Sequence, residues 1–350
     1  MSDKLEKSKK EYRYLFYVTL SYSFSILRPI AEQITKQGAK FAWFVPQGAE
    51  AESYLLAEDN RLIDVDAVMA FAPDAVLAPG NYIPDFFPGI KVQVFHGFDS
   101  GKKNKFNIRG FFDLYCTQGP NITQAFKQIN DGTCEIVETG WGKLDALFNP
   151  HPLTASYRTA APLILYAPTF SPKLTSTYSL LPEIKSLLKH QAWQWLVKLH
   201  PKATAEEIAM FKALECDKLR FVETAELIPL LQAADVLLSD TSSVLAEFAL
   251  QQKPVVALNN RRPESWMIHF TQASDLKENL ELALNCPPQQ LDKINAHCHA
   301  IHPLRDGKSS ERTLAAINWL IDKGTAHLKA KPLNLRRRLK MRKKLNYWKF

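Results

Sequence analysis

Glycine is scarce in this chain, with 13 residues among 350. Neither GxGxxG nor GxxxxGK(S/T) occurs, and these are the glycine-rich motifs that hold phosphate groups in dinucleotide-binding and P-loop proteins. The sequence therefore disfavours Rossmann dehydrogenases and P-loop kinases. Any phosphate group must be bound by helix starts, hydroxyl groups, histidine or lysine instead.

Cysteine and long apolar runs are also in short supply. The five cysteines are scattered without a CxxC pair, which indicates free thiols in a reducing compartment. The uncharged stretch 14–27 is too short to span a bilayer and is interrupted by serine and threonine. It predicts a first strand and its loop rather than an export signal, so the expected compartment is the cytoplasm.

The order of apolar runs and helical segments predicts an α/β protein with two doubly wound parallel-sheet domains facing a cleft. Short apolar runs alternate with helical patterns, which is typical of parallel strands covered on both faces. Three prolines and no periodicity mark a linker at 149–162. The expected domains are 12–148 and 163–326, followed by a basic tail at 327–350. The expected strands lie at 15–20, 41–45, 75–78, 92–95, 114–117, 136–138, 163–166, 195–199, 220–222, 236–238 and 255–258.

The stretch LLSDTSSVLAEFALQQKPVVAL, residues 237–258, predicts a strand, a turn, a helix and a second strand. Its turn holds Asp240, Thr241, Ser242 and Ser243 at the carboxyl end of the first strand. One small polar residue suffices to cap a helix. Four in succession favour an anion, such as the phosphate of a nucleotide, at the helix start.

Two histidines follow predicted strands in the same way. His96 precedes Gly97, and near neutral pH it could take a proton from an attacking hydroxyl group. The alternative is a histidine that only bonds to a backbone carbonyl. His200 ends the run Lys198-Leu199-His200-Pro201, and when protonated it would offset charge on a phosphate leaving group.

Two clusters have the composition of metal sites but favour other roles. Asp64-Val65-Asp66 lies where a helix is expected to begin, so a capping role is favoured over a carboxylate pair for a metal. His297-Cys298-His299 with His302 lacks a CxxC partner and reads as a polar helix end. We therefore expect no metal site.

Positive charge is concentrated at the end of the sequence. Residues 336–350 hold eight Lys or Arg and no acidic residue, and without them the chain has 36 basic and 36 acidic residues. Aromatic and aliphatic residues lie between the cations, a pattern typical of a segment that binds an anionic membrane surface. A disordered solubilising end and a nucleic-acid-binding segment are the alternatives, and we do not expect nucleic acid as the partner.

Six motifs, taken in order, resemble the CDP-glycerol glycerophosphotransferase family, whose members build or prime teichoic acids. The family's Trp-His-Gly and Gly-x-Pro-Arg-x-Asp resemble Phe95-His96-Gly97 and Gly140 to Asp145. Its Tyr-Ala-Pro-Thr is identical at Tyr166 to Thr169. The Lys-x-His-Pro and Asp-Tyr-Ser-Ser motifs resemble Lys198 to Pro201 and Asp240 to Ser243, and Asp-Gly-x-x-Ser-x-Arg matches Asp306 to Arg312.

The resemblance implies a GT-B fold and the transfer of a polyol phosphate, with glycerol phosphate preferred and ribitol phosphate as the alternative. The donor would be a CDP-alcohol, the acceptor a hydroxyl group of a lipid-linked or cell-envelope glycan, and the product CMP. It implies no metal or other cofactor, and the basic tail suits an enzyme on the inner face of the cell membrane. The implied catalytic residues are His96 and His200. The implied donor-binding residues are Tyr166, Thr169, Lys198, Asp240, Thr241, Ser242, Ser243, Glu247, Asp306, Gly307 and Arg312, and the acceptor-side residues are Gly97, Lys105, Gly140 and Asp145.

Two other functions remain open on the sequence. A GT-B nucleotide-sugar glycosyltransferase or a UDP-sugar epimerase can also carry a polar turn and helix before a strand such as KPVV. A membrane-tethered nucleotide-binding adaptor without enzymatic activity is the third alternative.

Overall fold

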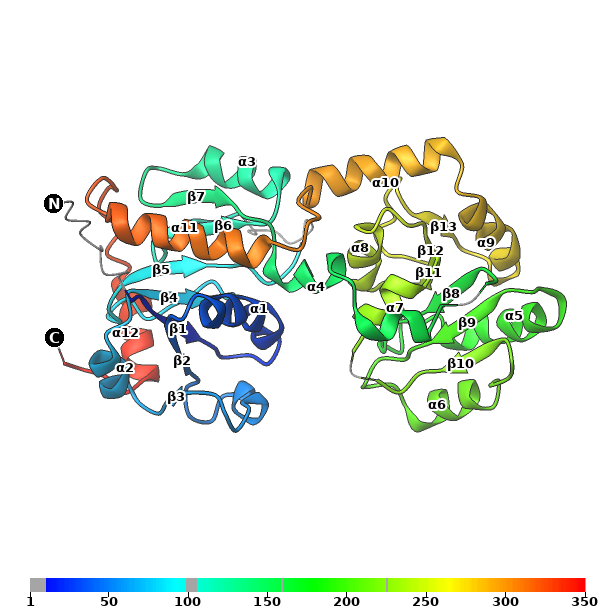
Figure 1. The fold of residues 1–350 in the computed structure, drawn as a ribbon, viewed down its shortest axis with the longest axis horizontal. Helices are drawn as coiled ribbons and strands as arrows, with labels where there is room; N and C mark the ends of the chain where they lie inside the picture. The colour runs from blue at the N-terminus through cyan, green and yellow to red at the C-terminus, as the bar shows by residue number, and fades with distance from the viewer. Residues whose placement is uncertain (1–10, 99–105, 159, 225, 350) are drawn as a thin grey trace, which may run out of the picture. The chain divides into compact units, whose positions relative to one another are not determined.

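The computed structural model describes residues 11–98, 106–158, 160–224 and 226–349. The chain divides into two compact units (Figure 1). Unit 1 comprises Met1–Asp145 and Ile301–Phe350, and unit 2 comprises Ala146–Ala300. Unit 1 is therefore formed by both ends of the chain, and unit 2 is one continuous segment.

A seven-stranded parallel sheet forms the centre of unit 1, in the order β3-β2-β1-β4-β5-β6-β7. Every strand after the first pairs in parallel with its neighbour, so all the carboxyl ends lie along one edge. The bounds are β1 (Arg13–Tyr17), β2 (Lys40–Phe44), β3 (Arg61–Leu62), β4 (Ala75–Ala78), β5 (Ile90–Gln93), β6 (Leu114–Thr117) and β7 (Glu135–Glu138).

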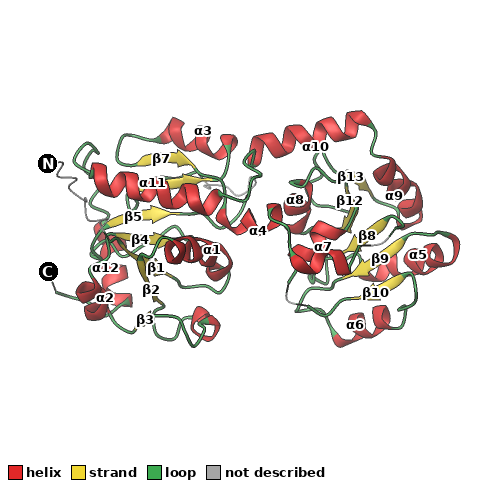
Figure 2. Cartoon of the chain, viewed as in Figure 1, coloured by secondary structure: helices red, strands yellow, loops and turns green. Residues whose placement is uncertain are grey.

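Helices cover both faces of this sheet (Figure 2). On one face, Tyr14 of β1 donates a hydrogen bond of 2.5 Å to Asn318 of α11. The other face carries a buried cluster that includes Leu15, Phe44 and Val76. The helices are α1 (Ser23–Lys36), α2 (Val65–Phe71), α3 (Pro120–Ile129), α11 (Ser309–Lys323) and α12 (Leu335–Lys344), with 3-10 turns η1 (Glu50–Tyr54) and η2 (Gly142–Leu144).

The basic segment at the end of the chain is part of unit 1. Met341, Leu345 and Tyr347 pack against the buried cluster, and the Tyr347 ring stacks on Phe86 at 5.0 Å. The tail expected at 327–350 thus contains the helix α12, one side of which packs against the core of unit 1. The structure also places 301–326 in unit 1, whereas the sequence suggested a second domain at 163–326.

Unit 2 is built around a six-stranded parallel sheet in the order β10-β9-β8-β11-β12-β13. Its core includes Trp195, Phe211 and Leu238, which are almost completely buried. The strands are β8 (Leu163–Tyr166), β9 (Gln194–Val197), β10 (Leu219–Phe221), β11 (Val236–Ser239), β12 (Val255–Leu258) and β13 (Ile268–Phe270). The helices are α4 (Asp145–Phe148), α5 (Thr177–His190), α6 (Ala205–Lys212), α7 (Ile228–Ala233), α8 (Val244–Ala249), α9 (Leu276–Asn285) and α10 (Pro288–Ile301), with 3-10 turns η3 (Pro152–Ser156) and η4 (Ala273–Asp275).

The described residues of the expected linker, 149–158 and 160–162, belong to unit 2. Gln232 of α7 donates hydrogen bonds to the carbonyls of Ala146, Leu147 and Asn149. Its side-chain oxygen accepts from the Thr154 hydroxyl at 2.7 Å. The half-buried Gln232 side chain therefore holds the first part of this segment against α7.

In each unit, the chain first adds strands on one side of its first strand and then adds the later strands on the other side. The strand order therefore reverses between β1 and β4 in unit 1 and between β8 and β11 in unit 2. Ligands of doubly wound sheets bind at the carboxyl ends of the strands near such a reversal. The predicted α/β class with two parallel doubly wound sheets is confirmed. Among the helices of the described ranges, none is long and apolar enough to cross a membrane.

Candidate functional site

His96 follows β5 at the carboxyl edge of the sheet of unit 1. Its Nδ1 lies 3.1 Å from the carbonyl oxygen of Pro79, which follows the neighbouring strand β4. A carbonyl oxygen can only accept, so Nδ1 carries a proton, and in the neutral ring the lone pair is on Nε2. The side chain is exposed. The neutral form of His96 therefore offers an unprotonated nitrogen to solvent, as a general base requires.

The backbone before His96 is held in an uncommon conformation. Phe95 has a φ of +52° although it is not glycine, and its ring is buried against Tyr115 and Phe126. Strained backbone of this kind is found preferentially at functional sites. Gly97 follows, and the Tyr22 ring lies 5.7 Å from the His96 ring. Lys105, predicted on the acceptor side, lies outside the described residues.

Gly140 and Asp145 form a tight contact with the start of α11. Each oxygen of the buried Asp145 carboxylate accepts one amide hydrogen, from Ser309 and Ser310 at 2.7 Å. Gly140 has a φ of +80°, and a Cβ there would lie 2.4 Å from the Ser309 hydroxyl. These two residues, predicted to face the acceptor, thus join segments about 160 positions apart and position the α11 start. Both are buried, so neither side of this contact is open to direct binding of an acceptor.

His302 completes this contact as a neutral side chain. Its Nε2 accepts the amide hydrogen of Trp141 at 2.9 Å. Burial lowers the pKa of His302 to about 4, because a charged imidazole is poorly solvated there. The histidine therefore helps to fix the loop after β7 and does not act as a cation near neutral pH.

Asp306, Gly307 and Arg312 also lie in unit 1, next to this contact. Asp306 and Arg312 form an ion pair, and this bond to the guanidinium lowers the pKa of Asp306. Gly307 adopts a φ of +67° in the turn before α11. The sequence grouped these residues with the second half, so the structure changes the unit to which the motif belongs.

In unit 2, Asp240 holds the loop after β8. Its Oδ1 accepts from the Thr169 amide and its Oδ2 from the amide and hydroxyl of Ser176, all at 2.9 Å. The Tyr166 hydroxyl lies 2.9 Å from the same Ser176 hydroxyl. Asp240 and Tyr166 are fully buried, so neither can contact a donor directly, contrary to the prediction. Burial raises the pKa of Asp240, and these hydrogen bonds oppose that shift.

The turn after β11 carries three hydroxyl groups, at Thr241, Ser242 and Ser243, of which Thr241 and Ser242 are half-buried. Thr241 accepts from the Arg261 amide at 3.2 Å, and Ser242 accepts from the Val244 amide at 3.4 Å. Ser243 is exposed and its side chain does not cap α8. The sequence predicted more hydroxyl groups in this turn than are needed to cap the helix, and the Ser243 hydroxyl is such a group. Glu247 is buried within α8.

His200 follows β9 at the same edge as Thr169 and Ser243. Its Nδ1 accepts from the Lys202 amide at 3.1 Å, so the proton of the neutral ring is on Nε2. Burial lowers the pKa of His200, and Lys198 and Lys202 add to this effect. The prediction of a protonated His200 is thus not supported in the free protein. The geometry indicates a neutral N–H donor.

Three residues of unit 2 were missed by the sequence reasoning. The exposed Phe170 ring lies 4.3 Å from the His200 ring, and the Lys202 ammonium lies 5.5 Å from the centre of the Phe170 ring. Lys198, which was predicted, is half-buried and donates to the Leu199 carbonyl at 2.9 Å. The third missed residue is Ser176, which bonds to Asp240, because nothing in its sequence context distinguishes it from other serines.

Two parallel doubly wound sheets, each with polar side chains at its carboxyl edge, define a protein of the GT-B fold class. Residues 93–260, a little under half of the chain, match the family described as CDP-Glycerol:Poly(glycerophosphate) glycerophosphotransferase. The resemblance predicted from the motifs is confirmed over these residues. The motif from Asp306 to Arg312 lies beyond them.

The chain is also similar to individual proteins in sequence or in fold. The teichoic acid glycerol-phosphate primase of Bacillus spizizenii is 37% identical over 162 residues, which is 44% of this chain and 36% of that protein. The chain thus spans only about a third of that relative. The wall teichoic acid polymerase TagF matches in fold with a TM-score of 0.63 and 14% identity, covering 90% of both chains. A UDP-GlcNAc 2-epimerase from Neisseria meningitidis gives 0.58 and 14%, covering 89% of this chain and all of the other.

Proposed function

We propose that this protein transfers a polyol phosphate, preferably glycerol phosphate, from a CDP-alcohol to a hydroxyl group of a lipid-linked or cell-envelope glycan. The family match over 93–260 supports the reaction class. The observation that carries the chemistry is the hydrogen bond from His96 Nδ1 to the Pro79 carbonyl. It leaves Nε2 unprotonated at an exposed position, ready to receive a proton.

In the proposed step, His96 Nε2 removes the proton of the acceptor hydroxyl as its oxygen attacks the β-phosphorus of the donor. A new oxygen–phosphorus bond forms to the acceptor. The bond from the β-phosphorus to the bridging oxygen breaks, and CMP leaves with the bonding electrons. Positioned proton transfer of this kind contributes roughly a hundredfold to ten-thousandfold in rate.

Unit 2 supplies the groups proposed to hold the donor pyrophosphate. The Nε2–H of His200 and the exposed Ser243 hydroxyl both donate hydrogen bonds, which become stronger as negative charge develops on the leaving phosphate. Lys198 adds a nearby cation. The transfer as proposed uses these side chains and no metal or other cofactor.

Nucleotide release tests this proposal directly. The protein is incubated in separate reactions with CDP-glycerol, CDP-ribitol and UDP-sugars, and the released CMP or UDP is measured. We expect CMP from a CDP-alcohol in the presence of a glycan acceptor. Release of UDP alone would instead establish the nucleotide-sugar glycosyltransferase or epimerase, which the fold also resembles.

We further propose that the outer face of α12 binds an anionic membrane surface on the cytoplasmic side. Leu335 and Leu339 are 61% and 49% exposed and lie one turn apart. Exposed cations flank them at Arg336, Arg337 and Lys340. An amphipathic basic face of this kind inserts its apolar side chains while its cations meet the headgroups.

A truncation would not test the membrane proposal, because α12 also covers the core of unit 1. The appropriate variant is the double substitution Leu335→Glu and Leu339→Glu, with the exposed Ile63→Glu as the control. Sedimentation with vesicles that contain an anionic lipid should fall for the double variant and not for the control. Equal binding of all three proteins would contradict the proposal.

A further inference from the structure

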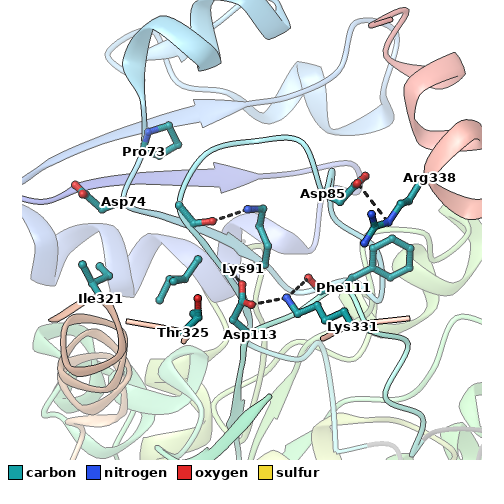
Figure 3. A pocket seen from close by; sticks show the side chains of 13 residues that line it. Pro73, Asp74, Asp85, Lys91, Phe111, Asp113, Ile321, Thr325, Lys331 and Arg338 are labelled. Carbon is teal, nitrogen blue, oxygen red and sulfur yellow. Dashed lines mark hydrogen bonds and ion pairs between the residues drawn. The ribbon is translucent and has the colours of Figure 1, made fainter. Parts of the chain in front are cut away.

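A polar cavity of about 660 Å³ lies at the amino ends of β4, β5 and β6 in unit 1 (Figure 3). His96 follows the opposite ends of these strands, so the cavity is separate from the proposed catalytic edge. Part of its wall comes from Ile321 of α11 and from Thr325 just after that helix. Another part comes from Lys331, before α12, and from Arg338 within α12.

Lys91 is the deepest charged group of this cavity. Its side chain lies within the sheet at 6% exposure, and its ammonium donates one hydrogen bond, 2.5 Å long, to the Gly89 carbonyl. An ammonium has three hydrogens to donate. A buried cation with unused donors is costly unless an acceptor reaches it.

The terminal segment closes the cavity through charged contacts. Lys331 pairs with Asp113 and donates to the Phe111 carbonyl at 3.3 Å. Arg338 Nε lies 3.4 Å from Asp85 Oδ2. Figure 3 shows these pairs on the wall around Lys91.

Two further polar atoms on this wall are buried without a hydrogen bond. They are Asp85 Oδ1, an acceptor, and Arg338 Nε, a donor. Buried polar groups of native proteins nearly always have a partner. A species that accepts from Lys91 and Arg338 and donates to Asp85 would satisfy these groups.

We propose that this cavity binds a small phosphate monoester that carries a hydroxyl group, such as a free polyol phosphate. Phosphate oxygens accept from Lys91 and Arg338, and the hydroxyl donates to Asp85. The positive charges of the wall are equal in number to the negative charges of its carboxylates, Asp74, Asp85 and Asp113. The exposed cations of α12 add a positive electrostatic potential that favours a dianion. This site does not depend on the proposed transferase activity.

Burial also lowers the pKa of Lys91 to about 8, against opposing effects of Asp113 and Asp85. The ammonium is thus largely charged near neutral pH and loses its proton above about pH 8. Binding of the phosphate monoester is expected to weaken over that range.

Calorimetric titration with glycerol phosphate, sulfate and glycerol tests the site on the full chain. We expect glycerol phosphate to bind the wild-type protein and Lys91→Met to lower its affinity about tenfold or more, as for the loss of a charged hydrogen bond. Lys185→Met removes an exposed cation of α5 in unit 2, away from the cavity, and serves as the control. Glycerol alone should not bind, because it lacks the anion.

Asp85→Asn provides a second variant of nearly unchanged size. It should weaken the binding of glycerol phosphate relative to sulfate, because sulfate has no hydroxyl group to donate. CMP release by Lys91→Met should equal that of the wild type. Binding that survives in Lys91→Met but is lost in His96→Ala would assign the ligand to the catalytic edge and overturn the proposal. The proposal would also be overturned if the wild type bound no glycerol phosphate at about 10 mM, a limit that corresponds to only a few kcal/mol of binding free energy.

Discussion

The side chain of His96 acquires its proposed chemistry from a backbone carbonyl on the neighbouring strand end. From the sequence, a histidine bonded to a backbone carbonyl was the alternative to a catalytic histidine at this position. In the structure, the carbonyl of Pro79 is what leaves Nε2 unprotonated. The two interpretations are therefore compatible, because each ring nitrogen has one of the two tasks.

His96→Ala is expected to lower CMP release about a hundredfold or more, since the proton acceptor is lost. The measurement is the initial rate with CDP-glycerol and a glycan acceptor. His190→Ala, an exposed histidine at the end of α5, is the control and should leave the rate unchanged. A membrane-tethered adaptor without activity predicts that His96→Ala keeps its biological role.

His200 is expected to act as a neutral donor through Nε2. His200→Gln, which retains an N–H group, should therefore keep more activity than His200→Ala, for which a loss of about a hundredfold is expected. The pH–rate profile of His200→Gln should also have the same shape as that of the wild type, because a His200 of lowered pKa stays neutral near neutral pH. If both variants lost the same activity, the donor role would be excluded.

At the scale of elements, the start of α11 depends on a carboxylate from a distant segment. Asp145→Ala leaves two buried amide hydrogens without an acceptor, so the free energy of unfolding should fall by about 3 kcal/mol. Asp64→Ala is the control: it removes an exposed cap with one bond to Ala67, and about 1 kcal/mol is expected. Denaturant unfolding measures both, and equal losses would contradict the argument.

Strand positions in the core could be predicted from the sequence because fully buried strands are apolar at every residue. The runs 75–78, 114–117, 163–166 and 255–258 coincide with β4, β6, β8 and β12. β3 and β13 have two and three residues, too few to show a pattern. The helix after β1 begins at Ser23, within the stretch 14–27 that the sequence assigned to a strand and its loop, because the serines there obscured the helical pattern.

The candidate site was predictable only where a motif also contacts solvent. His96, His200 and Ser243 follow strands and are exposed, as the patterns suggested. The bracing role of Asp240 and the contact between Asp145 and α11 depend on partners 64 to 165 positions away. No local pattern encodes such separations, so these roles required the three-dimensional structure.

For the whole molecule, the buried lysines couple stability to pH. The pKa of Lys91 is about 8 in the folded protein against 10.5 for an ordinary lysine. The unfolded chain binds more protons between these values, so this residue makes the free energy of unfolding rise with pH from about 8. Lys253 acts in the same direction.

Lys91→Met should therefore reduce the rise in stability between about pH 8 and 9.5 relative to the wild type. Lys340→Met, which removes an exposed lysine, should show the same rise in the free energy of unfolding with pH as the wild type. Denaturant unfolding at several pH values provides the comparison. Parallel pH profiles for wild type and Lys91→Met would show that the amine is not held at a lowered pKa.

The division of unit 1 into two segments has a consequence for the order of folding during synthesis. Met341, Leu345 and Tyr347 pack against its core, and they are synthesised after the whole of unit 2. Unit 2 is complete once Ala300 has been made, and domains generally fold as units while the chain emerges. Unit 2 can thus reach its native state before α11 and α12 are available to pack on the sheet of unit 1.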